Sequence, residues 1–518
     1  MFARAKAGTI IGVDAHDVVV EAHRAGGFPS AVLIGLARGA MRESLVRLRS
    51  AIGTANADLD NCRLVVNLLP AELPKEASAL DLAVAVAMLA AVGKLPAEQL
   101  AGRRFFGELS LGGELEPSRG AVLLADLARR EGDAELIVPA VNAPEAAVIP
   151  GVRVVGAETL LQVLRHLRGE QHLSPAAPAA ARETSSAGCF SEVRGQTRAK
   201  RALEIAAAGG HNVLLMGPPG SGKTMLARRV PSLLPALTAE ESIEVTRIHS
   251  VAGMLQHRRL MRQRPFRAPH HTASEVALCG GGTVPRPGEI TLAHRGVLFL
   301  DEFPEFSRRA LESLREPLEE GYIHVARAAM ALCFPAKVLL VAAMNPCPCG
   351  YYRAESAAGA APKRPAQTCL CAFEQIRRYR ARLSGPLLDR IDLHVSVEPV
   401  PFGQLSSPGS GAESSAAIRG RVVAARAIQH GRLGTNRTNA DMDRRQIHRD
   451  VPLDHENMAL VEAAVETHGI SARALTRALK VARTIADLDG TDVRPEHLQE
   501  ALGFRLLDRP LGLGGVAA

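Results

Sequence analysis

The stretch Gly217-Pro-Pro-Gly-Ser-Gly-Lys223-Thr224 is the most informative part of this chain. An apolar run at 213–216 precedes it, and a short run compatible with a helix follows at 225–227. This order of strand, glycine loop and helix is typical of a phosphate-binding P-loop, because small residues let successive backbone N–H groups wrap a phosphate. We therefore predict an ATP site in which Lys223 reaches the β- and γ-phosphates and Thr224 holds Mg²⁺. The nucleotide-binding residues are expected to be Gly217, Pro218, Pro219, Gly220, Ser221, Gly222, Lys223 and Thr224.

Two later strands are expected to end at the same site. The apolar run Val297-Leu-Phe-Leu300 leads directly into Asp301-Glu302. An acid pair in this position can support Mg²⁺ through Asp301 and polarise the attacking water through Glu302. A surface turn after a core strand is the alternative, which the complete P-loop upstream disfavours. A further strand at 338–342 leads to Asn345, a polar residue that can contact the γ-phosphate and the water.

Composition limits the other function classes. The chain has 518 residues, 47% of them hydrophobic, and about two to four domains are expected. The formal net charge of +8 favours a polyanionic partner, although many basic proteins bind none. No sustained apolar stretch follows Arg4 and Lys6, and the longest apolar run, 82–92, is too short to span a bilayer. We expect a cytoplasmic protein without a signal peptide or membrane partner, whose eight cysteines form no disulfides.

Patterning divides the chain into five segments. Residues 1–170 alternate strand-like and helix-like runs, as in an α+β domain, and 171–188 form an Ala-, Pro- and Ser-rich linker. Residues 189–402 contain the nucleotide signatures of an α/β domain, 403–416 are expected to be a flexible break, and 417–510 are helical. In the first segment, strands are expected at 18–21, 64–67, 136–138 and 152–155, and helices at 38–50 and 80–91.

Four of the cysteines form two close pairs, Cys347-Pro-Cys349 and Cys369-Leu-Cys371, with nineteen residues between the pairs. Four thiolates suit tetrahedral Zn²⁺, although this spacing is tighter than the common Cys-x₂-Cys knuckle. Four unrelated thiols are the alternative. We predict a zinc site with a structural role, because four protein ligands leave no open position for water.

The order of these motifs resembles the AAA+ ATPases, and more closely their magnesium-chelatase-like branch, the ComM/YifB family. The resemblance covers nearly the whole chain, with matching stretches at 193–196, 264–272, 287–290, 292–305, 343–350, 383–390 and 479–488. It implies that Asn345 is sensor 1, that Arg473 is sensor 2, and that Arg390 is an arginine finger reaching a neighbouring subunit's nucleotide, with Arg382 as a weaker alternative. A finger that acts in trans implies a ring, which in this family is expected to be a homo-hexamer.

The family also has two hairpin insertions, expected here within 273–288 and 322–335. Rings of this type point such hairpins into the pore, so Arg286 and Arg327 are candidate DNA contacts, unless they merely cap surface turns. A basic run either follows a nucleic-acid backbone or forms a solvated face; it comprises Arg258, Arg259, Arg262, Arg264 and Arg267. His270-His271 lacks the Cys or acid spacing of a metal site and is expected to be structural.

The N-terminal segment resembles the proteolytic domain of Lon, an α+β fold similar to ribosomal protein S5, at 73–80 and 107–117. Lon-type chemistry needs a serine activated by a lysine. Ala79 stands at the nucleophile position and Val122 at the lysine position, with Ser78 one residue away. The resemblance therefore implies an inactive relative that serves ring assembly or substrate contact.

Together these features predict an α/β AAA+ core with an α-helical lid, preceded by the Lon-like α+β domain. The resemblance implies an ATP-driven hexameric motor on single-stranded and branched DNA, which drives branch migration in homologous recombination during natural transformation, with recombination proteins as candidate partners. A chelatase-type motor that remodels a protein partner is the alternative. An ATP-dependent protease is a third hypothesis, disfavoured by Ala79 and Val122.

Overall fold

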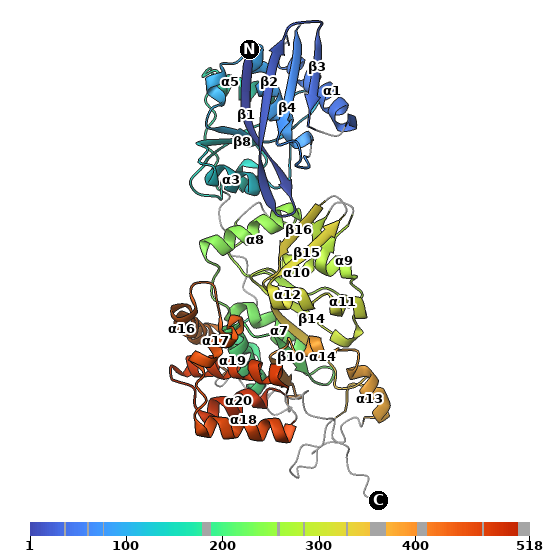
Figure 1. The fold of residues 1–518 in the computed structure, drawn as a ribbon, viewed down its shortest axis with the longest axis vertical. Helices are drawn as coiled ribbons and strands as arrows, with labels where there is room; N and C mark the ends of the chain where they lie inside the picture. The colour runs from blue at the N-terminus through green and yellow to red at the C-terminus, as the bar shows by residue number, and fades with distance from the viewer. Residues whose placement is uncertain are drawn as a thin grey trace, which may run out of the picture.

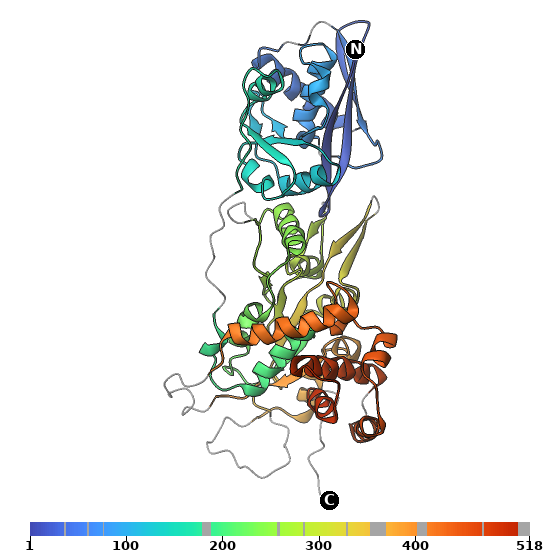
Figure 2. The same ribbon diagram turned by 90° about the vertical axis from the view of Figure 1, so that its left-hand side faces the viewer.

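The computed structural model describes residues 1–35, 38–57, 59, 62–75, 77–178, 188–255, 260–282, 285–327, 330–352, 369–400, 412–468 and 471–505. The described parts form an elongated molecule with an N-terminal α+β domain at one end (Figure 1). The P-loop domain lies in the middle, and the C-terminal helices, orange to red, pack beside it (Figure 2). None of the helices in the described ranges is both long and apolar enough to cross a membrane.

The N-terminal domain is built on a seven-stranded mixed sheet of order β3-β4-β2-β1-β5-β8-β9. Its strands are β1 (Phe2–Ile11), β2 (Asp14–Ala25), β3 (Ser30–Ile34), β4 (Arg63–Leu69), β5 (Arg103–Phe105), β8 (Glu135–Pro139) and β9 (Arg153–Ala157). The helices are α1 (Arg38–Thr54), α2 (Asp81–Ala91), α3 (Ala121–Arg130) and α5 (Leu160–Leu167). Every residue of α2 is buried, which explains why this segment has an apolar run without an amphipathic period. The strands and helices predicted in this segment are confirmed to within a few residues.

The P-loop domain is built on a five-stranded parallel sheet of order β11-β14-β17-β10-β18. The strands are β11 (Phe266–Arg267), β14 (Val297–Leu300), β17 (Leu339–Met344), β10 (Val213–Met216) and β18 (Leu393–Ser396). Because helices cover both faces, the inner strands are continuous apolar runs. Since all the strands point the same way, their carboxyl ends meet at one edge of the sheet, where the P-loop lies.

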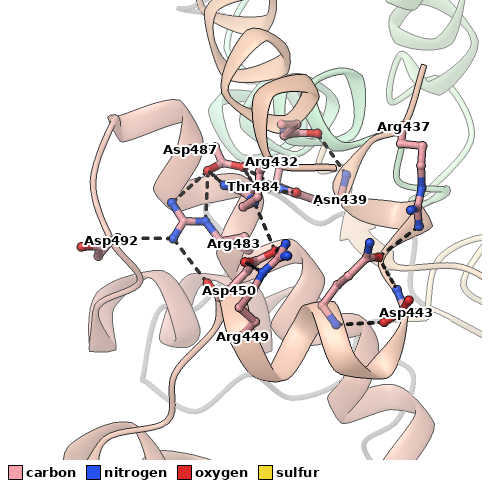
Figure 3. Close-up of polar contacts among 12 residues, drawn as sticks. Arg432, Arg437, Asn439, Asp443, Arg449, Asp450, Arg483, Thr484, Asp487 and Asp492 are labelled. Atoms are coloured by element: carbon pink, nitrogen blue, oxygen red, sulfur yellow. Dashed lines mark hydrogen bonds and ion pairs between the residues drawn. The ribbon is translucent and has the colours of Figure 1, made fainter. Parts of the chain in front are cut away.

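The C-terminal helical region contains α16 (Ser415–Leu433), α17 (Arg444–Asp450), α18 (His455–His468), α19 (Ala472–Asp489) and α20 (Pro495–Gly503). Helices predicted at 416–429 and within 454–502 are therefore present. The buried Asp487 carboxylate holds part of this region together (Figure 3). It accepts hydrogen bonds from Arg432 at 2.8 Å, Asn439 at 2.7 Å and Arg483 at 3.0 Å. These donors come from α16, from the short 3₁₀ helix η7 (Asn439–Asp441) that follows it, and from α19 itself, so one carboxylate connects distant segments. Most of the break expected at 403–416 lies outside the described residues.

The N-terminal domain packs directly on the P-loop domain. Val13, in the turn between β1 and β2, is 5% exposed and belongs to a hydrophobic cluster of the P-loop domain. Arg247 of α8 (Ala239–Val251) donates to the Val13 carbonyl at 2.9 Å and pairs with Asp14. The expected linker begins later than 171, because the Ala176 N–H donates to the Val154 carbonyl of β9 at 2.8 Å. Residues 179–187 of that linker lie outside the described residues.

Two hairpins occur where insertions were expected. The first pairs β12 (Gly280–Gly281) with β13 (Arg286–Pro287), and the second pairs β15 (Tyr322–Arg327) with β16 (Met330–Pro335). The second hairpin lies beside the β1–β2 turn, because a Cβ atom on Gly12 would be 3.6 Å from the Phe334 ring. The N-terminal domain therefore contacts this insertion directly.

Candidate nucleotide site

The P-loop runs from the end of β10 into α7 (Lys223–Arg229). A Cβ atom on Gly217 would lie 2.2 Å from the Val397 carbonyl oxygen, so no larger residue fits there. Gly222 has φ of +91° immediately before the helix, a conformation that favours glycine. Ser221 has a buried hydroxyl with no hydrogen-bond partner among the described residues. The loop thus has the tight backbone and the spare buried hydroxyl expected of a phosphate cradle.

Lys223 and Asn345 come together although 122 residues separate them. The Lys223 ammonium donates to the Gly217 carbonyl at 2.7 Å, to the Pro218 carbonyl at 3.0 Å and to the Asn345 side-chain oxygen at 3.3 Å. Burial lowers the pKa of Lys223, and the nearby Asp301 opposes that shift. The two side chains meet because β10 and β17 are hydrogen-bonded neighbours. One phosphate group can therefore contact both of them.

Thr224 and Asp301 supply the oxygen atoms expected for Mg²⁺. The Thr224 hydroxyl donates to Asp301 Oδ2 at 2.8 Å, and Asp301 Oδ1 accepts the Glu302 N–H at 2.9 Å. Hydroxyl and carboxylate oxygens, completed by phosphate and water, are the usual donor set of this ion. The residues present therefore fit a magnesium nucleotide.

Glu302 contacts a histidine that the sequence did not assign to the site. Glu302 has φ of +50°, which is uncommon for a residue other than glycine, and its side chain is 55% exposed. His271 Nδ1 lies 2.8 Å from Glu302 Oε2. The contact holds His271 beside Glu302, in keeping with a structural role, whereas His270 makes a local contact with Thr272. The sequence did not reveal this contact because it depends on the order of the strands in the sheet. His271 lies a few residues after β11, and β11 pairs with β14, the strand that leads into Asp301-Glu302.

The three predicted arginines do not join this cluster. Arg390 donates to the Arg315 carbonyl at 3.1 Å and pairs with Glu319, both in α12 (Arg315–Glu320). Arg382, the alternative finger, pairs with Glu305 at 2.5 Å. Arg473 is exposed near the start of α19. Their roles in catalysis stay predictions.

Asp392 is a further residue of interest, which lies two residues after Arg390 and to which the sequence analysis assigned no role. Its buried carboxylate lies 3.3 Å from His211 Nδ1 and 3.2 Å from Arg477 of α19. Burial alone would raise the pKa of Asp392, but Arg477 and His211 hold that pKa well below its ordinary value. His211 also contacts Thr484 of α19 at 2.8 Å. These contacts join the P-loop sheet to α19 of the C-terminal helical region, at a position two residues after Arg390 in the chain.

Two arginines of the basic run form ion pairs with glutamates of the P-loop domain. Arg264 is 9% exposed at its side chain and pairs with Glu241 at 2.9 Å, and Arg267 forms two hydrogen bonds with Glu289 at 2.6 and 2.7 Å. Both earlier interpretations of the run are therefore wrong for Arg264, whereas Arg267 remains partly exposed and its role stays a prediction. Arg262 is exposed, whereas Arg258 and Arg259 lie outside the described residues.

The predicted DNA contacts lie on the two hairpins. Arg286 is exposed on β13. Arg327 ends β15, but its side chain lies outside what the structure describes. Whether either residue faces a pore stays a prediction.

The four paired cysteines converge. Cys347 Sγ lies 3.3 Å from Cys349 Sγ and 3.7 Å from Cys369 Sγ, and the last two sulfur atoms are 3.6 Å apart. Cys371 completes a group whose sulfur atoms all lie within 4.8 Å of one another. Four sulfur atoms around a tetrahedral Zn²⁺ at about 2.3 Å would be separated by about 3.8 Å. The cluster therefore fits this ion.

In the N-terminal domain, Ala79 and Val122 belong to one buried hydrophobic cluster. The two positions that the resemblance to Lon would assign to the nucleophile and the base therefore have no reactive side chain.

Comparison with known families and proteins finds matches along nearly the whole chain. The family model "Magnesium chelatase, subunit ChlI" matches residues 189–405, "Subunit ChlI of Mg-chelatase" matches 20–142, and "Magnesium chelatase, subunit ChlI C-terminal" matches 412–505. The chain is 44% identical to competence protein ComM of Haemophilus influenzae over 97% of both chains. It is 43% identical to YifB of Escherichia coli over 97% of this chain and 96% of that protein. A shorter match, 27% identity over 30% of this chain and 23% of the relative, is with the magnesium-chelatase 67 kDa subunit of Chlorobaculum tepidum.

Proposed function

The chain belongs to the magnesium-chelatase-like AAA+ family of ComM and YifB, and from this premise we propose that it is an ATP-driven hexameric DNA motor. The proposed activity is branch migration in homologous recombination during natural transformation. The proposal of ATP hydrolysis rests on one observation. Four side chains lie together at one edge of the parallel sheet, namely those of Lys223, Asn345, Thr224 and Asp301. The DNA part rests on the 44% identity to a competence protein and on the net charge of +8.

In this proposal each residue has a separate role in hydrolysis. Lys223 would bind the β- and γ-phosphates, and Asn345 would contact the γ-phosphate. Thr224 and Asp301 would hold Mg²⁺, which when bound would supply positive charge beside the phosphate oxygens. Glu302 accepts a proton from the attacking water. His271 fixes the position of the Glu302 carboxylate through the 2.8 Å contact. Arg390 of an adjacent subunit completes the site, which requires it to leave Glu319.

The proposed function is tested on branched DNA. With ATP, the purified protein should form a hexamer and separate three- and four-stranded junctions, and the Lys223→Ala variant, which lacks the phosphate-facing cation, should do so more slowly. Because phosphate contacts supply the affinity, log K should fall by roughly 0.7–0.9 per neutralised phosphate for each unit of log salt. Arg286→Ala should make that slope shallower, whereas Arg309→Ala, an exposed arginine of α11 (Arg308–Glu312), should not.

A hexamer that hydrolyses ATP but neither binds nor remodels junctions at low salt would contradict the DNA-motor proposal. That result would favour the alternative, a chelatase-type motor that remodels a protein partner, which the shorter match to the 67 kDa subunit supports.

We further propose that Cys347, Cys349, Cys369 and Cys371 bind one structural Zn²⁺ per chain. Metal analysis of freshly purified, never-chelated protein should find one zinc per chain, and Cys369→Ser should lose it. Cys62→Ser, a cysteine outside the cluster, should keep it. Structural zinc contributes roughly 10–16 kcal/mol of apparent binding free energy in small domains, so its absence from never-chelated protein would exclude this assignment.

A further inference from the structure

The turn that contains the first cysteine pair packs directly against the P-loop. Gly350, which follows Cys349, has φ of +88°, and a Cβ atom at this position would lie 2.5 Å from Cδ and 2.9 Å from Cγ of Pro219. Real Cβ atoms do not approach so closely, so the glycine is needed for the backbone to lie against the proline ring. The cysteine turn therefore packs directly against the Pro219 ring.

The same turn is joined to the P-loop along a second route. Cys347 is completely buried and lies two residues after Asn345, the side chain that accepts from Lys223 at 3.3 Å. The preceding Met344 carbonyl accepts the Gly217 N–H at 3.2 Å. Thus one short segment provides the phosphate-facing amide, a hydrogen bond to the first P-loop residue and the first cysteine.

The cysteine turn is also held by hydrogen bonds that do not involve the P-loop. The Gly350 N–H donates to the Cys347 carbonyl at 3.0 Å, and the Tyr352 N–H donates to Cys347 Sγ at 3.3 Å. Arg380 of α13 (Phe373–Arg380) donates to the Pro346 carbonyl at 3.3 Å and lies over the Tyr352 ring. This helix begins two residues after Cys371, so the second cysteine pair is joined to the same support.

We propose that the four-cysteine cluster positions the P-loop, so that metal binding and nucleotide binding are coupled through the Gly350–Pro219 contact and through Asn345. This inference rests on the proposed zinc site. A bound metal fixes the turn by joining two chain segments, and the fixed turn limits the movement of Pro219 and Asn345. By linkage, nucleotide must strengthen metal binding by the same factor by which metal strengthens nucleotide binding. Gly350 and Pro219 are positioning residues in this scheme.

The contact between Gly350 and Pro219, here called the packing route, is tested with Gly350→Ala. Its nucleotide Kd is measured by titration with a fluorescent ATP analogue, and its zinc content by metal analysis. The variant keeps all four cysteines and should keep one zinc per chain, while its nucleotide Kd should rise by roughly 5–150-fold, the usual range of coupling between sites. Gly434→Ala is the matched control, because Gly434 has φ of +90° but nothing within 4 Å of an added Cβ atom. Its Kd should equal that of the unchanged protein.

A double variant identifies the contact itself. Pro219→Ala removes the ring atoms that the new methyl group would meet, so Gly350→Ala should weaken nucleotide binding less in the Pro219→Ala background than in the unchanged protein. The backbone strain of alanine at φ of +88° is the same in both backgrounds. An additional loss in the double variant, equal to that of Gly350→Ala in the unchanged background, would overturn the packing route.

The coupling is also measured without any substitution. The zinc Kd, measured by competition with a chromogenic chelator, should fall when a non-hydrolysable ATP analogue is present, and the nucleotide Kd of zinc-stripped protein should rise by the same factor. Equal nucleotide Kd values for zinc-loaded and zinc-stripped protein would overturn the coupling while leaving the zinc assignment intact. Never-chelated protein without zinc would instead overturn the zinc assignment, and the coupling with it.

Discussion

Glu302→Gln is expected to bind ATP normally and to hydrolyse it roughly 10²–10⁴ times more slowly, the usual contribution of a positioned general base. The amide has nearly the shape of the carboxylate but cannot take a proton from water. Lys223, Thr224 and Asp301, which are proposed to hold the magnesium nucleotide, are unchanged by this substitution. The measurement is kcat together with the nucleotide Kd, so that loss of chemistry is separated from loss of binding.

Glu312→Gln is the control for Glu302→Gln, since Glu312 lies in α11 and pairs with Arg315. It should hydrolyse ATP at the unchanged rate. His271→Asn should lower kcat by less than Glu302→Gln, because it removes only the group that positions the carboxylate. If Glu302→Gln hydrolyses ATP at the native rate, the proposed role of Glu302 is wrong.

Arg390→Ala is expected to leave the fold and nucleotide binding intact and to slow hydrolysis by roughly 10³–10⁵-fold, as for other arginine fingers. Arg390 makes its contacts with α12 and with Pro386 at 2.6 Å, all away from the P-loop of its own chain. A thermal melt checks the fold, because the loss of these contacts could also change stability. Arg382→Ala serves as the comparison and should retain activity.

Mixing two inactive proteins tests whether Arg390 acts in trans. In rings that contain both Arg390→Ala and Glu302→Gln subunits, some interfaces combine an intact arginine with an intact glutamate, so ATP hydrolysis should partly return. Each protein alone should stay inactive at the same total concentration. If no mixing ratio restores activity, Arg390 acts within its own chain or Arg382 is the finger.

The features that were predicted correctly belong to contiguous segments. The P-loop, the Asp301-Glu302 strand end and the close pairs of cysteines each depend on a local backbone path and on neighbouring residue types. The family to which the P-loop motif belongs then implies the order of the strands. The end of β17 does lie beside the P-loop, where Asn345 contacts Lys223. The helices and strands of the N-terminal domain were also predictable, because burial leaves a local apolar pattern, which is a continuous apolar run in the fully buried helix α2.

The contacts that were missed join residues far apart in the chain. The sequence does not show that His271 lies against Glu302, that Gly350 lies against the Pro219 ring, or that Arg264 is engaged inside the protein. An arginine in a basic run looks the same whether it faces solvent or a buried carboxylate, since only packing brings the partner near. Local chemistry depends on residues adjacent in sequence, whereas these contacts depend on which strands and helices become neighbours when the apolar surfaces are buried.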